Sequence, residues 1–298
     1  MRFTKMQAFG NDYVYIDAVH QKLHELPLSL SALACLVSNR HFGVGSDGMV
    51  LICPSEKADF RMRIFNPDGT EAEMCGNALR SVGKYVYDHK LTSQTEVVIE
   101  TLGGLKKLKL SVGDGLVSNI RADIGEPVLS ANKIPVATSL SEFIEQPVKV
   151  FERTFFVTAV SWGNPHCVAY VDSVKDLDVD KYGPALEYMT SLFPNKTNVT
   201  FAELVDRDYV KIREWERGTG ETIGCGTGCA TAVVAGVLTD RCSRHVTVEQ
   251  IGGPLDIEWD KETNRLIMEG PSHTVFEGEI EDELLPACAD RIRRKEDL

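Results

Sequence analysis

The sequence predicts an α+β protein of two pseudo-symmetric domains, each a curved sheet wrapped around one central helix. A short aromatic-Gly-Asn motif occurs twice, as FGNDYVYID at residues 9–17 and as WGNPHCVAYVD at residues 162–172. A Cys-Gly pair that opens a helical pattern also occurs twice, at Cys75 and at Cys225. The remainder of each half is rich in strand patterns, which is typical of an internally repeated, sheet-based architecture.

The spacing of these motifs supports a duplication. Asn11 precedes Cys75 by 64 residues, and Asn164 precedes Cys225 by 61 residues. Unrelated coincidences would rarely fall at nearly the same spacing twice. We therefore expect each half to supply one Gly-Asn turn and one Cys-Gly helix start.

Strand patterns fill both halves. In the first half they lie at residues 12–17, 48–53, 60–65, 96–101, 105–112 and 116–123. In the second half they lie at residues 155–161, 167–171, 199–205, 209–215, 246–251, 254–259 and 265–269. The sequence GDG at residues 113–115 is typical of a hairpin turn between two of these strands.

Helical patterns are fewer and fall at residues 29–39, 75–89 and 225–239, with Ser29 or Ser31 as the cap of the first. The last of them reads CGTGCATAVVAGVL, which is small and apolar on every side. A helix without a polar face is buried all round. This favours a sheet that curves around the helix, while an ordinary two-layer α+β domain remains the alternative.

The domain boundaries follow from the repeat. We expect an N-terminal half of residues 1–123 plus 271–298, which carries the Cys75 helix, and a C-terminal half of residues 124–270, which carries the Cys225 helix. Residues 124–150 contain three prolines and no steady period, so we expect the crossover there. The tail after residue 280 is charged and has a helical pattern.

Charge and cysteine content exclude several classes of function. The net charge of −12 argues against a nucleic-acid-binding or anionic-membrane surface, because both need basic patches. We find no signal peptide and no membrane-spanning stretch, and expect a soluble, cytoplasmic protein. The eight cysteines form no CxxC pair, and no ligand set for a metal stands out.

Each Cys-Gly pair places a thiol where a helix begins. The first N–H groups of a helix lack intrahelical partners and carry the positive end of its dipole. An anion is stabilised there, and the pKa of a thiol can fall below its ordinary value of ~8.5. Gly76 and Gly226 allow a ligand to approach the backbone closely. We therefore expect an ionisable thiol and an N–H cradle for an anion in each half.

Other interpretations of residues 221–229, ETIGCGTGC, fit less well. A dinucleotide fingerprint needs GxGxxG and a later acidic residue, and a Walker loop needs Gly-Lys-Ser/Thr. Neither is present. A single-cysteine protease would leave the duplication unexplained. A reversible redox disulfide between Cys75 and Cys225 remains open.

Two opposed thiols suit the inversion of a carbon centre. One thiol removes a proton from the carbon, and the other returns a proton to the opposite face. The N–H groups of both helices can bind the neighbouring carboxylate, on which negative charge develops during deprotonation. This chemistry requires no cofactor, and we find no lysine context typical of a pyridoxal enzyme.

With these motifs in place, the chain resembles the diaminopimelate epimerase family from Met1 to about residue 280. The resemblance rests on FGNDYVYID, RHFGVGSDG (40–48), FNPDGTEAEMCGNALR (65–80), WGNPHC (162–167), KTNVTF around Asn198, REWERGTGETIGCGTG (213–228) and GPSHTVFEGEI (270–280).

The resemblance implies two domains, each a β-barrel-like sheet around a central helix, with the site between them. It implies an isomerase that interconverts L,L- and meso-2,6-diaminopimelate in lysine and peptidoglycan precursor biosynthesis. Neither pyridoxal phosphate nor metal is implied. The small-molecule substrate is the expected partner, and a homodimer is implied, with Phe276 near the dimer contact.

The resemblance also assigns roles to residues. Cys75 and Cys225 match the two catalytic thiols of a two-base mechanism. His166 and Glu216 match residues that tune the pKa of these thiols. The implied substrate contacts are Asn11, Asn66, Gly76, Asn77, Asn164, Asn198, Glu216, Arg217, Gly226 and Thr227.

These roles suit a substrate with two amino acid ends. Arg217 can hold a distal carboxylate in a fork, and Asn66, Asn164 and Asn198 can bind an ammonium or a carboxylate. From the sequence alone, Asn66 lies in an NPDG turn. Some family members carry glutamine, a substrate contact, where this chain has Gly48.

A racemase for a single-ended amino acid is the nearest alternative. Such a substrate would leave Arg217 and the three asparagines unpaired, at a cost of ~1–3 kcal/mol for each buried group. The redox disulfide is the alternative from another class of protein. It predicts a measurable reduction potential and no proton exchange at carbon.

Overall fold

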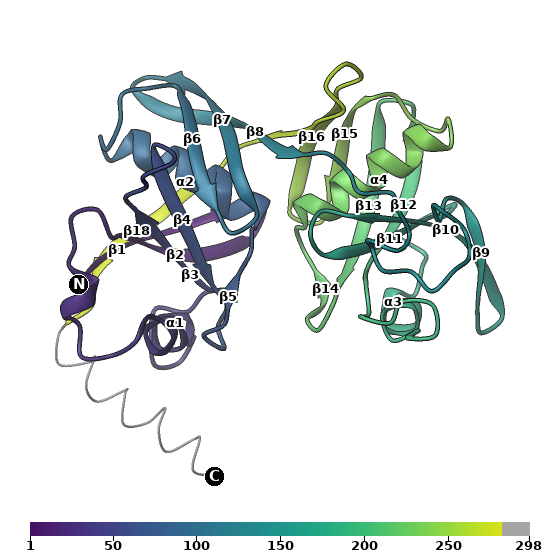
Figure 1. Ribbon diagram of the computed structural model, residues 1–298, viewed down its shortest axis with the longest axis horizontal. Coiled ribbons are helices and arrows are strands. Elements are labelled where there is room, and N and C mark those ends of the chain that lie inside the picture. Colours follow the sequence, from purple (N-terminus) through teal and green to yellow (C-terminus); the bar gives the residue numbers. More distant parts are fainter. Residues whose placement is uncertain (282–298) are drawn as a thin grey trace, which may run out of the picture. The chain divides into compact units, whose positions relative to one another are not determined.

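The computed structural model describes residues 1–281. The chain divides into two compact units (Figure 1). Unit 1 contains Met1–Ile120 and the segment that begins at Pro271, and unit 2 contains Arg121–Gly270. The helical tail expected after residue 280 lies, beyond Glu281, outside the described residues.

Unit 1 is built on strands that follow one another along the chain with two helices between them. The strands are β1 (Arg2–Ala8), β2 (Asn11–Asp17), β3 (Met49–Cys53), β4 (Phe60–Phe65), β5 (Glu71–Ala72), β6 (Glu96–Thr101), β7 (Gly104–Gly113), β18 (His273–Glu279) and the first half of β8 (Leu116–Gly125). β2 pairs antiparallel with β1 and parallel with β3. β4 pairs antiparallel with β3 and β5 and parallel with β6, which pairs antiparallel with β7.

Unit 2 repeats this order of pairing. Its strands are β9 (Gln146–Val150), β10 (Arg153–Ser161), β11 (Pro165–Tyr170), β12 (Asn198–Asp206), β13 (Tyr209–Glu216), β14 (Gly220–Thr222), β15 (His245–Gln250), β16 (Gly253–Trp259) and β17 (Leu266–Gly270). β11 pairs antiparallel with β10 and parallel with β12. β13 pairs antiparallel with β12 and β14 and parallel with β15, which pairs antiparallel with β16. The internal duplication inferred from the sequence is therefore present in the strand topology.

The helices occupy matching places in the two units. They are α1 (Leu30–Ser38) and α2 (Gly76–Asp88) in unit 1, and α3 (Val179–Glu187) and α4 (Gly226–Leu238) in unit 2, with a short 3-10 helix η1 (Leu23–Glu25) before α1. Ser29 caps α1, because its side chain accepts a hydrogen bond from the Ala32 N–H at 3.2 Å. α2 follows β5 and α4 follows β14, so each helix with an N-cap cysteine is preceded by the same hairpin.

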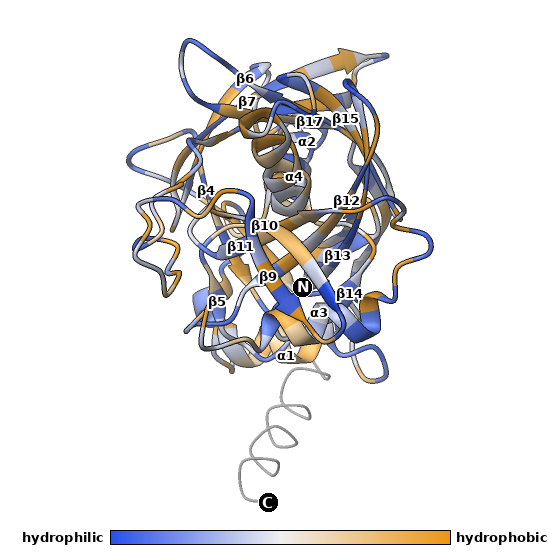
Figure 2. Ribbon diagram, turned by 90° about the vertical axis from the view of Figure 1, so that its right-hand side faces the viewer, coloured by the Kyte–Doolittle hydropathy of each residue, from blue (hydrophilic) through white to orange (hydrophobic). Residues whose placement is uncertain are grey.

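The helix α4 lies inside unit 2, as its composition predicts. All but three of its residues are buried, and it contacts β10 to β13 and β15 to β17. In unit 1, α2 is buried from Gly76 to Val86 and contacts β1, β4 and β7. Figure 2 shows the contrast in hydropathy, with many blue loops and orange stretches along the strands. A curved sheet around a central helix thus describes each unit, and the predicted α+β fold class is confirmed.

Several elements escaped the sequence patterns. β18 is exposed along nearly its whole length, so it has no apolar alternation, and it forms because it pairs with β1. β9 lies at the end of the stretch expected to be an irregular crossover and pairs with β10. The helix α3 contains Gly183 and Pro184, which obscure a helical pattern.

The expected hairpin turn at residues 113–115 is present. β7 ends at Gly113, β8 begins at Leu116, and Asp114 and Gly115 have φ angles of 52° and 79°. Two successive positive φ angles are typical of the two-residue turns that join twisted antiparallel strands. In the described part of the chain, no helix combines the length and apolar character needed to cross a membrane.

Candidate active site

A bidentate ion pair precedes each of the two helix-start cysteines. In unit 1, Arg63 of β4 donates to Glu71 of β5 through Nε at 2.8 Å and Nη2 at 2.7 Å. In unit 2, Arg213 of β13 donates to Glu221 of β14 through Nε at 2.6 Å and Nη2 at 2.8 Å. Such forks fix both distance and orientation. They hold the two hairpins that deliver the chain to the starts of α2 and α4.

Cys75 occupies the N-cap position of α2, with an extended backbone (φ −139°, ψ 123°). Its Sγ donates a hydrogen bond of 3.4 Å to Oδ1 of Asn11, which opens β2. Asn77, in the first turn of α2, also directs its Nδ2 toward Asn11 Oδ1 at 3.5 Å. The structure therefore brings together Asn11, Cys75, Gly76 and Asn77 in unit 1.

Asn11 is held from the other side by a charged loop. Its Nδ2 donates to Asp47 Oδ2 at 3.0 Å, and Arg40 donates to Asp47 Oδ1 at 2.9 Å. This orients the amide so that its oxygen points to Cys75. Burial raises the pKa of Tyr13 well above its ordinary value, and the nearby Cys75 raises it further. Tyr13 therefore remains a neutral hydroxyl beside the thiol.

Asn66 lies in a tight turn, as the NPDG sequence predicts. Its backbone N–H donates to Thr70 O at 2.8 Å, and its Nδ2 donates to Thr70 Oγ1 at 2.9 Å. Gly69 closes the turn with a bond to Asn66 O at 3.0 Å. The side chain is half-buried and its nitrogen is directed within the turn.

At Gly48 the backbone leaves no room for a side chain. A Cβ there would lie 2.3 Å from Phe65 O and 2.8 Å from Cε1 of Tyr13. Glutamine at this position would therefore require Tyr13 or the end of β4 to move. The absence of a side chain at Gly48 thus leaves room for the ring of Tyr13, which lies beside Cys75.

Cys225 is the N-cap of α4, and the helix start binds its sulfur. Its Sγ accepts from the Gly228 N–H at 3.4 Å and lies 3.4 Å from Thr227 Oγ1. Its own backbone N–H donates to Oε1 of Gln250, the last residue of β15, at 2.8 Å. Cys225, Gly226 and Thr227 thus form one cluster in unit 2.

The pKa of Cys225 differs from the sequence-based expectation. We expected the helix N-terminus to lower it. Instead, burial raises the pKa of the Cys225 thiol well above its ordinary value, and the charges of Glu216 and Glu214 add to this effect. The hydroxyl of Thr227 and the N–H of Gly228 act in the opposite direction but are outweighed. Desolvation of a buried anion exceeds the stabilisation from one helix end.

Asn198 and Arg217 are joined at the ends of β12 and β13. Oδ1 of Asn198 accepts from the Arg217 N–H at 2.9 Å, and Nδ2 donates to Pro165 O at 2.9 Å. Asn198 is buried, whereas the Arg217 side chain is exposed and donates to Asn195 O at 3.0 Å. This arrangement fixes the backbone that carries the guanidinium.

His166, on β11, is completely buried. Its Nε2 lies 3.5 Å from Asn198 Nδ2, and its Nδ1 lies 3.6 Å from Oε1 of Glu214. Burial lowers the pKa of His166 to about 4, against the opposing charge of Glu216, so the ring is neutral near pH 7. His166 therefore meets Cys225 indirectly, because Glu214 interacts with the thiol.

The remaining residues expected at the site flank these groups. Glu216 ends β13, and its Oε1 accepts from Thr222 Oγ1 at 2.6 Å. Asn164 is half-buried and immediately precedes β11, where its carbonyl accepts from the Trp162 N–H at 3.3 Å. Asn164 thus occupies in unit 2 the place that Asn11 occupies in unit 1.

Sequence reasoning missed Glu214, Gln250 and the two ion-pair forks. The forks leave a signal, because Arg63, Glu71 and Cys75 recur exactly 150 positions later as Arg213, Glu221 and Cys225. Glu214 leaves none. A glutamate within an alternating strand is usually solvent-facing, and only the packing of β13 against α4 shows that it is buried.

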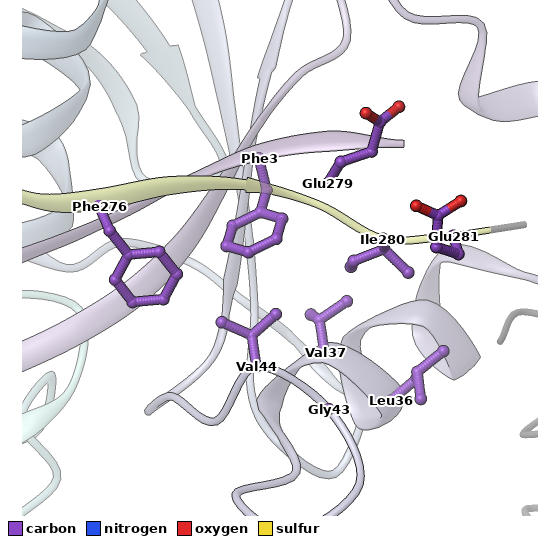
Figure 3. A pocket seen from close by; sticks show the side chains of 9 residues that line it. All are labelled: Phe3, Leu36, Val37, Gly43, Val44, Phe276, Glu279, Ile280 and Glu281. Carbon is purple, nitrogen blue, oxygen red and sulfur yellow. The ribbon is translucent and has the colours of Figure 1, made fainter.

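A separate apolar pocket of about 430 Å³ lies in unit 1 and contains none of the expected site residues. Figure 3 shows its walls, with the rings of Phe3 and Phe276 beside Val44 and with Glu279 and Glu281 near Ile280. The two rings meet edge to face at 5.8 Å. Within residues 1–281, no group of three or more His, Cys, Asp or Glu side chains could hold a metal ion.

Comparison with solved structures identifies the fold. A phenazine biosynthesis protein of the PhzF family from Bacillus anthracis superposes with a TM-score of 0.65 at 18% identity, covering 94% of this chain and 99% of that one. A probable proline racemase from Agrobacterium radiobacter K84 gives a TM-score of 0.70 at 12% identity, covering 94% and 92%.

Comparison of sequences identifies the family. A family model described as diaminopimelate epimerase matches residues 3–130 and 158–275. Diaminopimelate epimerases from Methanococcus maripaludis (strain C5) and Acetivibrio thermocellus are each 49% identical over 281 residues. Both alignments cover 94% of this chain, with 100% and 99% of the respective relative. The chain therefore belongs to the diaminopimelate epimerase family.

Proposed function

We propose that this protein interconverts L,L- and meso-2,6-diaminopimelate, as an isomerase of lysine and peptidoglycan precursor biosynthesis. The named relatives support the substrate, because they are diaminopimelate epimerases at 49% identity over nearly their whole length. The observation that carries the chemistry is the repeated half-site. Cys75 and Cys225 are each an N-cap residue, followed by a glycine that begins a helix.

In the proposed mechanism the two thiols act on opposite faces of one α-carbon. One sulfur, as a thiolate, removes the α-proton, and the other, as a thiol, delivers a proton to the opposite face. The first N–H groups of α2 and α4, beginning at Gly76 and Gly226, bind the α-carboxylate as negative charge develops on it. No cofactor enters these steps.

The remaining residues are proposed to hold the two ends of the substrate. Asn11 and Thr227 lie beside the sulfurs, Asn77 lies beside Asn11, and all three suit the reacting end. The exposed guanidinium of Arg217 suits the distal carboxylate, and Asn198 positions it through the Arg217 N–H. The further proposed contacts are Asn66, Asn164 and Glu216, with His166 and Glu216 tuning the Cys225 thiol.

The direct test is proton NMR of the reduced protein with L,L-diaminopimelate in heavy water. Loss of the α-proton signal together with formation of the meso isomer is the expected result. Absence of exchange, with intact thiols, would refute the proposal for this substrate. Exchange at single-ended amino acids instead would identify a racemase.

Variants separate the thiol mechanism from a general loss of structure. Cys75→Ala and Cys225→Ala should each reduce epimerisation by more than ~100-fold, because each removes one proton-transfer group. Cys53→Ala, at the end of β3, should leave the rate unchanged and serves as the control. Full activity in either of the first two variants would contradict the two-base mechanism.

We also propose a homodimer in the cytoplasm. Phe276 is 46% exposed beside the apolar pocket of unit 1, which makes this face a reasonable contact between copies. A reducing compartment suits cysteines that act as thiols. Sedimentation at working concentration tests the dimer, since a monomer would exclude it, and cell fractionation tests the location.

A further inference from the structure

We propose that Glu214 exchanges a proton with Cys225, and so sets whether this sulfur is ready to act as a base or as an acid. The inference rests on the proposed function, in which Cys225 takes up or returns the substrate proton. Glu214 stands two residues before Glu216 on β13 and was not among the residues expected at the site.

The carboxyl group of Glu214 packs against the first turn of α4. It is 3% exposed, and a Cβ on Gly228 would lie only 2.4 Å from its Oε2. The N–H of the same Gly228 donates to Cys225 Sγ at 3.4 Å. The carboxylate and the thiol are therefore neighbours at one helix turn, and each affects the pKa of the other.

The two oxygens of Glu214 have different surroundings. Oε2 accepts a short hydrogen bond of 2.5 Å from Thr200 Oγ1. Within the described residues, neither Oε1 nor the Nδ1 of His166 has a hydrogen-bond partner, although these two atoms lie 3.6 Å apart. A buried carboxylate with one unpaired oxygen is costly, and a proton on that group removes the cost.

The tautomer of His166 follows from its other neighbour. Oδ1 of Asn198 accepts from the Arg217 N–H, so the side facing His166 Nε2 is the amide nitrogen, a donor. Nε2 is then the unprotonated nitrogen, and Nδ1–H faces Glu214 Oε1. At 3.6 Å the imidazole lies beyond hydrogen-bond distance of the carboxylate oxygen, and it does not itself change protonation near pH 7.

Other groups surround the pair within the described residues. Burial raises the pKa of Cys167, and the charge of Glu214 raises it further, so Cys167 remains a thiol. Thr200 of β12 and Gln250 of β15 do not titrate. The titratable and charged groups that face the pair are His166 and Cys167 from β11, Glu216 and Arg217 from the end of β13, and Cys229 from α4.

The exchange is a balanced proton transfer. The S–H bond of Cys225 breaks and an O–H bond forms on Glu214, which leaves a thiolate and a neutral acid. The reverse transfer restores the thiol and the carboxylate. The pair carries one negative charge in both arrangements, so the switch brings no new charge into the site. Burial raises the pKa of Glu214 to about 8 and also raises that of Cys225, which opposes a second charge.

Alkylation of Cys225 without substrate tests the inference independently of epimerase activity. The reduced, full-length protein is treated with limiting iodoacetamide between pH 6 and 10, and modification of the Cys225 peptide is measured by mass spectrometry. The alkylation rate of Cys225 in the wild type should level off above about pH 8. In this range Glu214 and Cys225 together hold one proton, and that proton is on the sulfur for part of the time. Glu214→Gln should give a single-proton curve and exceed wild type at pH 9.5 by at least ~tenfold, since the opposing charge is gone.

Glu187→Gln is the matched control. Glu187 is also buried in unit 2 (1% exposed), but its carboxylate accepts from Trp215 Nε1 at 2.8 Å and from the Gly218 N–H at 3.0 Å. Its variant should follow the wild-type curve. A Glu214→Gln curve that superimposes on wild type, or a Glu187→Gln curve with the same change, would overturn the inference.

Thr200→Val provides a test that leaves Glu214 in place. The Thr200 hydroxyl stabilises the carboxylate form of Glu214. Without it the proton shifts toward Glu214, and the level at which Cys225 alkylation flattens should rise. An unchanged or lower level would contradict the proposed exchange. Because none of these measurements uses diaminopimelate, failure here leaves the proposed function standing, and failure of the NMR assay leaves this result standing.

Discussion

Gly228→Ala probes the contact between α4 and the buried carboxylate. In an ordinary helix the change would stabilise the protein by up to ~1 kcal/mol, because alanine loses less backbone entropy on folding. Here the new Cβ would lie 2.4 Å from Oε2, 2.6 Å from Cδ and 2.9 Å from Oε1 of Glu214. The side chain cannot swing away freely, because it is buried and bonded to Thr200.

The expected effect combines three contributions. Overpacking costs ~1–3 kcal/mol, and displacement of the carboxylate from Thr200 costs ~1 kcal/mol more. The gain in helix propensity offsets ~1 kcal/mol. The free energy of unfolding should therefore fall by ~1–3 kcal/mol.

Tryptophan fluorescence during urea unfolding measures this change. The three tryptophans of the chain, Trp162, Trp215 and Trp259, all belong to unit 2, so the signal reports on the unit that contains Gly228. In a Glu214→Ala background the obstacle is absent, and Gly228→Ala should stabilise the protein by up to ~1 kcal/mol. An equal loss in both backgrounds would refute the assigned cause.

Three further predictions concern the forks, the buried histidine and Gly48. Arg213→Leu should lower the tryptophan-reported unfolding free energy by ~1–3 kcal/mol, because the partly buried fork to Glu221 is lost. Arg207→Leu, which breaks a largely exposed pair with Asp240, should change this free energy by less than ~0.5 kcal/mol. Equal effects of the two variants would contradict this account. The pKa of His166 is held at about 4, below the value of 6.5 in an unfolded chain, so the unfolded state binds more protons in this range and stability falls as the pH falls. The stability of wild type relative to His166→Gln should accordingly drop by ~3 kcal/mol between pH 7 and pH 4 in urea titrations, and a pH-independent difference would disprove it. Gly48→Ala should lower the free energy of unfolding, measured by calorimetry, by ~1–3 kcal/mol, because its Cβ meets Phe65 O. Gly113→Ala, with open space around its Cβ, should be nearly neutral. A neutral Gly48→Ala would show that the backbone at this position can move to accommodate the side chain.

Local pattern was sufficient for much of this protein. The repeated Gly-Asn and Cys-Gly motifs predicted the duplication, and the strand topology repeats between the two units. The apolar sequence after Cys225 predicted a helix buried on all sides, which α4 is. These features were readable because they depend on residue periodicity and on chain positions that local backbone geometry fixes.

The failures arise where neighbours in space decide the outcome or where local residues mask the pattern. β18 forms by pairing with the distant strand β1, which leaves no periodic signal in its own residues, whereas β9 is the first arm of a hairpin with the adjacent β10 and was hidden by a proline-containing stretch. The pKa of Cys225 was expected to be low from the helix end alone, but burial and two glutamates reverse the direction. Glu214 reads as a surface residue of an alternating strand until β13 is packed against α4.

The sequence alone thus determined the repeated architecture, the two cysteines that begin helices and the family to which the chain belongs. Only the tertiary structure decided which groups surround each thiol. Electrostatic environment depends on burial and on neighbours that are far apart in the chain, such as His166, Thr200 and Gly228 around Glu214, and no local pattern encodes that arrangement.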